Sequence, residues 1–181
     1  MSTREAEKRL AAAREVDVIK DGMFVGLGTG STTAYAIQSL SDRIRQGLRI
    51  TAVATSRATG MLARRLAVPL VPFEQFSSID LTIDGADEID CHFQAIKGGG
   101  GALLREKVVA AASSRMIVIV DASKVVQRLG GFPLAVEVVP FASEFVRTHL
   151  ANLGASVTLR SVGGEPFITD HSNHILDAAF G

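Results

Sequence analysis

The alternation of short apolar runs with helical segments is the feature that most constrains how this 181-residue chain can fold. The apolar runs are only a few residues long, which is typical of buried strands, and the last of them is rich in β-branched residues. They cover residues 23–27, 50–54, 68–71, 80–83 and 116–120. Helical patterns lie between most of them: one follows residues 28–33 and ends near residue 44, and two others cover residues 58–66 and 103–113. This alternation predicts a mostly parallel sheet with helices on both faces.

The pattern changes after the Gly-Gly-Phe-Pro segment at residues 130–133. The rest of the chain predicts a strand, a helix, a strand and a hairpin, at residues 135–139, 142–153, 156–160 and 166–178. A further helix is expected at the N-terminus, with Ser2 as its N-cap. We therefore predict an α/β, doubly wound, Rossmann-like domain at residues 1–130 and a small α+β lobe at residues 131–181.

Composition excludes several classes of protein. The formal net charge is zero, with 19 basic and 19 acidic residues, so the chain lacks the basic surface of a nucleic-acid-binding protein. No apolar run reaches the roughly 18 residues that span a membrane, and the N-terminus is too polar for a signal peptide. Cys91 is the only cysteine, which is typical of a reducing compartment. We expect a cytoplasmic globular protein with neither a nucleic-acid nor a membrane partner.

An acidic segment and a glycine run follow one another in the middle of the chain. Four acidic residues lie within DGADEID at residues 84–90, and KGGGG follows at residues 97–101. Clustered carboxylates repel one another and raise each other's pKa, while a glycine run gives up chain entropy and side-chain packing. Both costs in one region indicate a functional site, with carboxylates for proton transfer and backbone N–H groups for an anion.

The predicted topology gathers the polar residues at one edge of the sheet. The loop GLGTGSTT at residues 26–33, Asp84 and Asp121 each follow a predicted strand, and ligands of parallel sheets bind at the carboxyl ends of the strands. The loop opens a helix, whose first N–H groups attract phosphate. Its glycine spacing does not fit the dinucleotide fingerprint, and no lysine follows as in a Walker A loop. Phosphate binding is therefore favoured over a plain turn.

Simpler interpretations of the same residues stay open. Asp84 and Asp87 also fit an Asx-turn, and together with Glu88 and Asp90 they form a weaker candidate for a metal site, because the EF-hand spacing is absent. The glycine run also fits a mobile loop, although a nest of N–H groups that holds oxygen anions is favoured. Glu106, flanked by basic residues, would by itself be interpreted as a solvated helical acid.

Taken together, the motifs resemble ribose-5-phosphate isomerases of the A type. The resemblance rests on six segments, which together extend over nearly the whole chain: residues 26–32, 84–88, 97–107, 121–124, 132–138 and 169–177. It implies the cofactor-independent and metal-independent interconversion of D-ribose 5-phosphate and D-ribulose 5-phosphate, a step of the pentose phosphate pathway. It also implies a homodimer or higher homo-oligomer, with residues 1–130 as the catalytic domain.

The resemblance also implies roles for individual residues. Glu106 would be the base that moves a proton between C1 and C2, while Asp84, Asp87 and Lys97 would hold the sugar oxygens and assist ring opening. The substrate-binding residues that it implies are Thr29, Gly30, Ser31, Thr32, Asp84, Gly85, Ala86, Asp87, Lys97, Gly98, Gly99, Gly100 and Lys124. A weaker correspondence places Lys8 near the phosphate.

The chain departs from the family at its C-terminus. Family members continue past residue 181 with a further helix and strands, so we expect the lobe to be incomplete by roughly 30–45 residues. Three alternatives stay open: a non-catalytic sugar-phosphate sensor of the same fold, a deaminase or lactonase of similar architecture, and, because of the short C-terminus, an inactive truncated isomerase. The deaminase or lactonase would typically use a histidine, for which His92 is the candidate near the motifs.

Overall fold

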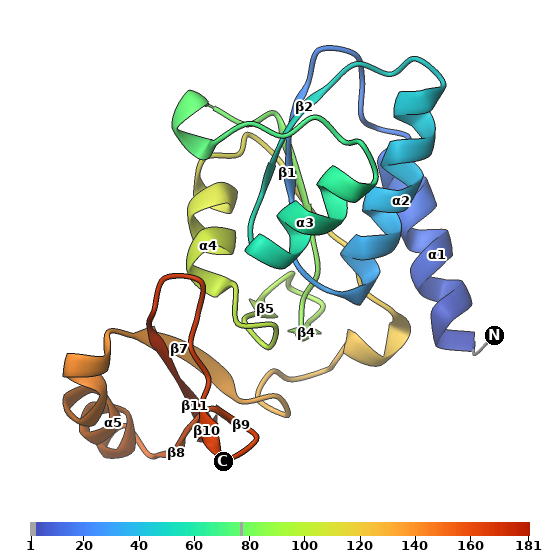
Figure 1. Ribbon diagram of the computed structural model, residues 1–181. Helices are drawn as coiled ribbons and strands as arrows, with labels where there is room; N and C mark the ends of the chain where they lie inside the picture. The colour runs from blue at the N-terminus through green and yellow to red at the C-terminus, as the bar shows by residue number, and fades with distance from the viewer. Residues whose placement is uncertain (1–2, 77) are drawn as a thin grey trace. The chain divides into compact units, whose positions relative to one another are not determined.

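The computed structural model describes residues 3–76 and 78–181, which form two compact units (Figure 1). The first unit consists of the described residues up to Ala86 together with Arg105–Lys124, and the second consists of Asp87–Leu104 and Val125–Gly181. The chain therefore passes from the first unit to the second and back before it ends in the second. The division into a domain at residues 1–130 and a lobe at residues 131–181 stays a prediction.

The first unit contains a four-stranded parallel sheet in the order β2-β1-β3-β6. The strands are β1 (Phe24–Leu27), β2 (Thr51–Ala54), β3 (Leu81–Asp84) and β6 (Met116–Val118). Val25 lies opposite Ala52 on one side and Leu81 on the other, which places β1 in the centre. The parallel sheet expected from the continuous apolar runs is confirmed.

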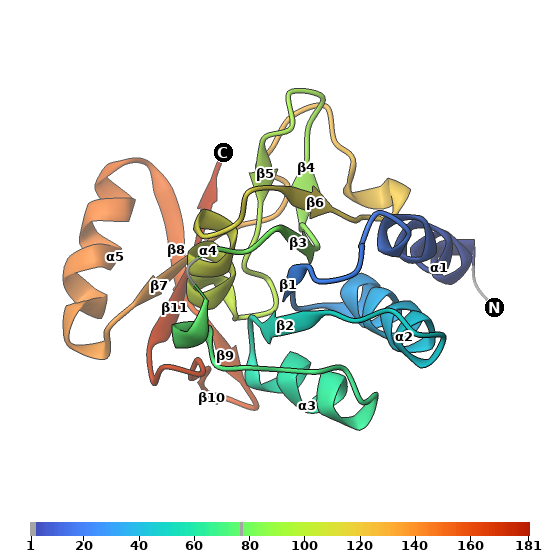
Figure 2. The ribbon, with the colours of Figure 1, turned by 90° about the horizontal axis from the view of Figure 1, so that it is seen from above.

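Helices cover both faces of this sheet (Figure 2). One apolar cluster joins the sheet to α1 (Thr3–Val16), α2 (Ser31–Arg45) and α3 (Arg57–Arg65). On the opposite face, α4 (Leu103–Ala111) inserts Val109 into a second cluster with Val53 and Ile79. Ser2, the predicted N-cap of α1, lies outside the described residues. Among the helices of residues 3–76 and 78–181, none combines the length and apolarity needed to cross a membrane.

The predicted strand at residues 68–71 is wrong. Leu70 forms a single isolated parallel bridge with Ala52, in which the Ala52 N–H donates to the Pro69 carbonyl at 2.9 Å and the Val71 N–H donates to the Ala52 carbonyl at 3.0 Å. Proline has no N–H to donate to a ladder, and Pro69 and Pro72 bracket these contacts. The segment then continues into the short 3₁₀ helix η1 (Phe73–Gln75).

The second unit contains a three-stranded antiparallel sheet in the order β7-β11-β8. Its strands are β7 (Leu134–Val138), β8 (Ala155–Leu159) and β11 (His174–Phe180), and η3 (Pro140–Ala142) and α5 (Ser143–Asn152) connect the first two. The predicted hairpin of residues 166–169 with 174–178 is wrong, because β11 pairs with β7 and β8 instead. Ile175 and Leu176 are both fully buried, as expected of a central strand. The turn at Gly163–Gly164 belongs to a separate hairpin of β9 (Ser161–Val162) and β10 (Glu165–Pro166).

The acidic segment contains a small hairpin that the sequence interpretation missed. β4 (Glu88–Ile89) pairs with β5 (Ala95–Ile96). At its turn, one carboxylate oxygen of Asp90 accepts from the N–H groups of His92 and Gln94, both at 2.9 Å. This turn leaves Cys91 and His92 exposed.

Candidate active site

Asp84 is the last residue of β3 and lies at the carboxyl end of the parallel sheet. It is fully buried, and its Oδ1 accepts hydrogen bonds from the N–H groups of Thr29 at 3.2 Å and Gly85 at 2.7 Å. The carboxylate reaches this position because residue 28 is glycine: a Cβ there would lie 2.0 Å from Asp84 Oδ1. The glycine after β1 thus makes room for a side chain from β3.

Thr29 belongs to a cluster of hydroxyl groups at the ends of β1 and β2. Its Oγ1 lies 2.9 Å from Thr55 Oγ1, 2.8 Å from Ser56 Oγ and 3.1 Å from Thr59 Oγ1. The Thr59 hydroxyl also donates to the Gly28 carbonyl at 3.0 Å. These contacts fix the loop that carries Thr29 and, through its N–H, the buried carboxylate of Asp84.

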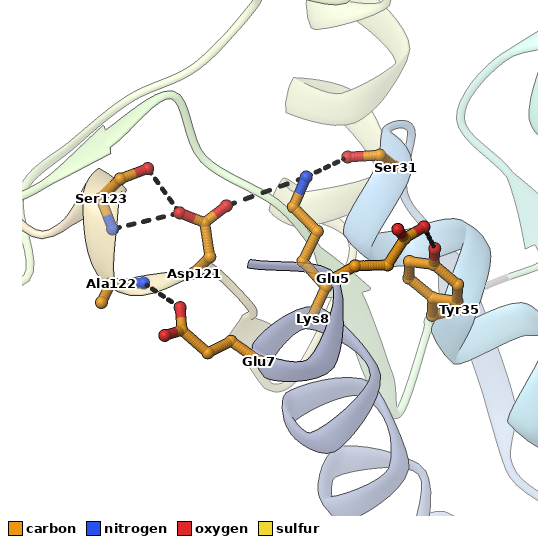
Figure 3. A network of polar contacts seen from close by, with 8 residues as sticks. All are labelled: Glu5, Glu7, Lys8, Ser31, Tyr35, Asp121, Ala122 and Ser123. Carbon is orange, nitrogen blue, oxygen red and sulfur yellow. Dashed lines mark hydrogen bonds and ion pairs between the residues drawn. The ribbon is translucent and has the colours of Figure 1, made fainter. Parts of the chain in front are cut away.

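The start of α2 combines several features that favour an anion. The N-cap is Gly30, with φ of 137°, which supplies no side-chain oxygen to the first N–H groups of the helix. Lys8, from α1, donates to Ser31 Oγ at 2.9 Å and forms an ion pair with buried Asp121 at 3.8 Å (Figure 3). Asp121 also accepts from the N–H of Ser123 at 3.1 Å. The predicted binding residue Lys124 closes the same turn, η2 (Ala122–Lys124).

Glu106 occupies the first turn of α4 and is 5% exposed. This finding corrects the simple interpretation of a solvated helical acid. Burying a carboxylate is costly, so the burial of Glu106 is consistent with the functional role that its motif predicts. In the sequence, the basic neighbours Arg105 and Lys107 suggested that Glu106 lies on the surface; of these, Lys107 is exposed.

In the second unit, the glycine run is held in place. Asp87 Oδ2 accepts from the Gly99 N–H at 2.7 Å, and the Gly101 N–H donates to the Gly98 carbonyl at 3.0 Å. A Cβ on Gly99 would lie 2.5 Å from Asp87 Oδ1, and Gly98 has φ of 109°, a conformation that favours glycine. The run is therefore a defined turn rather than the mobile loop considered above.

The other acidic residues of the segment have structural partners. Glu88 is buried, and its two carboxylate oxygens accept from the N–H groups of Gly130 at 2.8 Å and Phe132 at 2.7 Å. Asp90 caps the β4–β5 turn. In the part of the chain that the structure describes, no three His, Cys, Asp or Glu side chains are grouped so that they could hold a metal ion.

The predicted residues thus fall into two sets. The first unit contains Thr29, Gly30, Ser31, Thr32, Asp84, Gly85, Ala86, Glu106 and Lys124, and the second contains Asp87, Lys97, Gly98, Gly99 and Gly100. Sequence reasoning missed the hydroxyl groups after β2 and also Arg160, which contacts the glycine run. The hydroxyl groups carried a usable signal, because Thr55 and Ser56 follow a predicted strand as Thr29 does.

Comparison with known proteins shows the family of this chain. The family model described as ribose 5-phosphate isomerase A (phosphoriboisomerase A) matches residues 51–181. A ribose-5-phosphate isomerase A of Sphingopyxis alaskensis is 69% identical over 179 residues, which cover 99% of this chain and 78% of that protein.

Solved structures agree with these matches. A D-ribose-5-phosphate isomerase in complex with phospho-erythronic acid is 38% identical, with a TM-score of 0.95 over 99% of this chain and 80% of that one. The ribose 5-phosphate isomerase A of Methanocaldococcus jannaschii is also 38% identical, with a TM-score of 0.94 over 98% and 81% of the two chains. The chain therefore belongs to the ribose 5-phosphate isomerase A family.

Proposed function

We propose that this protein interconverts D-ribose 5-phosphate and D-ribulose 5-phosphate as an aldose–ketose isomerase, within the pentose phosphate pathway. The observation that carries the proposal is the burial of the Glu106 carboxylate in a chain of this family. A C–H bond next to a carbonyl is a weak acid, so its base has to be oriented and partly removed from water. The burial of Glu106, which removes its carboxylate from most of the solvent, supports this role.

The proposed chemistry moves one proton between neighbouring carbons. Glu106 removes the proton on C2 of the open-chain aldose, the C1 oxygen gains a proton, and an enediol or enediolate forms. Return of the carbon-bound proton to C1, with loss of the proton on the C2 oxygen, gives the ketose. We assign Asp84, Asp87 and Lys97 to the sugar oxygens during ring opening and this exchange, because carboxylates and an ammonium group are suited to move protons and to stabilise developing negative charge.

The proposed phosphate site is the start of α2. The ammonium group of Lys8 at 2.9 Å from Ser31 Oγ and the N–H groups after Gly30 would hold the phosphate, together with Thr32 and Lys124. Binding energy from this remote end then positions the reacting carbons. The hydrogen bonds of Thr29 support a role in which it fixes Asp84 and the loop, in addition to the substrate contact expected from its motif.

The decisive experiment follows ribose 5-phosphate by NMR in deuterated water. The wild-type protein should produce ketose, with deuterium at C1 wherever the proton held by Glu106 exchanges with solvent before its return, and Glu106→Gln should lower turnover by about 10²–10⁴-fold while substrate binding is kept. Glu74→Gln, at an exposed glutamate of η1 in the same unit, is the matched control and should turn over normally. Binding with neither ketose formation nor deuterium incorporation would identify a sensor instead.

We further propose that the protein is cytoplasmic and forms a homodimer or larger homo-oligomer. A single exposed cysteine supports a reducing compartment. Exposed apolar side chains such as Phe141 and Phe145 support self-association. Light scattering at several protein concentrations tests the oligomeric state, and a constant monomer mass would refute it.

A further inference from the structure

Arg160, immediately after β8, has a guanidinium group that contacts both the small sheet and the glycine run. Its Nε donates to Asp177 Oδ2 at 2.9 Å and its Nη2 donates to Asp177 Oδ1 at 2.5 Å. Its remaining terminal nitrogen, Nη1, donates to the carbonyls of Gly98 at 2.9 Å and Gly99 at 3.1 Å. One planar group therefore joins β11 to two consecutive peptide units that follow Lys97.

The backbone of Arg160 is fixed as firmly as its side chain. Its N–H donates to the Ile175 carbonyl at 2.9 Å, and its carbonyl accepts from the Phe167 N–H at 2.8 Å. The side chains of Arg160 and Asp177 are only 14% and 18% exposed. A two-bond pair between arginine and a carboxylate has a defined orientation, so the donors toward Gly98 and Gly99 are held in one direction.

The glycine run is held through both its carbonyl groups and its N–H groups. Arg160 binds the carbonyls of Gly98 and Gly99, and Asp87 accepts the Gly99 N–H at 2.7 Å. The ring of Phe167 fills the space beside Gly101, where a Cβ would lie 2.5 Å away. Because each peptide unit is planar, fixing the carbonyls of Gly98 and Gly99 also fixes the directions of the N–H groups of Gly99 and Gly100, directly after Lys97.

We propose that Arg160, oriented by Asp177, is a positioning residue for isomerisation: it sets the geometry of the Lys97–Gly100 segment that holds the sugar oxygens. This inference rests on the proposed function, because it concerns the rate of that reaction. Arg160 acts through the glycine run and is not assigned a contact with the substrate. A displacement of about 1 Å at a reacting group can lower the rate about 10²-fold, which sets the expected size of the effect.

The test compares Arg160→Met with Arg147→Met. Arg147 belongs to α5 of the same unit and forms a more exposed ion pair with Glu144 at 3.1 Å, so its substitution controls for general effects of losing an arginine. Steady-state kinetics with ribose 5-phosphate should show kcat lowered about 10–100-fold in Arg160→Met and changed less than about twofold in Arg147→Met. Arg160→Lys should not restore kcat, because lysine lacks the planar fork.

Two readouts separate positioning from a loss of stability. Guanidinium ion at low concentration should partly restore kcat in Arg160→Ala but leave the wild type unchanged. In a Lys97→Met background, Arg160→Met should lower kcat little further, because both act through the same segment. Should Arg160→Met fail to fold, Asp177→Asn provides a milder variant, with a smaller loss of kcat in the same direction.

Hydrogen exchange of residues 98–101 adds a readout that does not depend on activity, and Arg160→Met should make it faster. An inactive wild-type protein would reject the proposed function and not the anchoring of the glycine run. An active wild type, with faster exchange and unchanged kcat in Arg160→Met, would overturn the positioning role. Unchanged exchange would overturn the anchoring itself.

Discussion

Replacing Gly28 by alanine tests whether the end of β1 determines the position of Asp84. A Cβ at residue 28 would lie 2.0 Å from Oδ1, 2.2 Å from Cγ and 2.6 Å from Cβ of Asp84, whereas ordinary contacts of a Cβ are 3.4–4 Å. The carboxyl group would therefore have to recede by more than about 1 Å. That shift also disturbs its hydrogen bonds to the N–H groups of Thr29 and Gly85.

The structure sets the size of both expected effects. With Asp84 in its proposed role at the sugar oxygens, a shift of about 1 Å lowers kcat/KM about 10²-fold. Overpacking and weakened hydrogen bonds to a charged group together cost about 2–4 kcal/mol of unfolding free energy, which lowers Tm by roughly 5–15 °C in a chain of this size. Steady-state kinetics and thermal denaturation measure the two quantities independently.

Gly60→Ala is the matched control for this substitution. Gly60 lies within α3 of the same unit, and the nearest neighbours of an added Cβ are Arg64 Nη1 at 3.5 Å and Ala54 Cβ at 3.8 Å. Alanine is favoured in a helix, so activity should be unchanged and Tm equal or higher. Asp84→Gly removes all three clashing atoms, so adding Gly28→Ala to it should cost little further stability. Normal kcat/KM and normal Tm in Gly28→Ala would refute the reasoning.

Three further perturbations give separate tests. The pKa of Tyr35 is raised because its hydroxyl donates to the Glu5 carboxylate. The protonated hydroxyl therefore stabilises the fold at lower pH, and this contribution is lost as the pH rises through the raised pKa. Glu5→Gln should lower the pKa of Tyr35 in an absorbance titration, which reports this residue alone because the chain has one Tyr and no Trp. Equal titration curves would exclude this contact. Glu88→Gln leaves the N–H groups of Gly130 and Phe132 with one acceptor oxygen between them. Thermal denaturation should show a loss of about 1–3 kcal/mol of unfolding free energy, and an unchanged Tm would argue against a stabilising role for these two hydrogen bonds. Lys8→Met should raise the KM for ribose 5-phosphate at least about tenfold in steady-state kinetics, because the proposed phosphate site loses a cation; an unchanged KM would remove Lys8 from that site.

The sequence predicts those features that depend on local pattern. Continuous apolar runs between helical segments mark β1, β2, β3 and β6, since a strand buried on both faces needs no polar alternation. Glycines beside strand ends likewise mark the loop before α2 and the turn after Lys97. In both cases the chemical reason lies within a few residues of the feature.

Features that depend on distant partners were missed. The burial of Glu106 is hidden by its charged neighbours in sequence, Arg105 and Lys107. Arg160 contacts carbonyls 61 and 62 residues earlier in the chain, and no local pattern marks that distance. β11 pairs with β7 and β8 rather than with residues 166–169, because choosing partners for a strand depends on which sheet can bury both of its faces.

The return of the chain to the first unit at Arg105–Lys124 limits how the protein can be dissected. These residues supply α4 and β6, so a fragment ending at Ala86 would leave β3 as an open edge and uncover Val53 and Ile79. Such an edge invites pairing with other chains. During synthesis, too, the four-stranded sheet stays unfinished until the β4–β5 hairpin and the glycine run have left the ribosome.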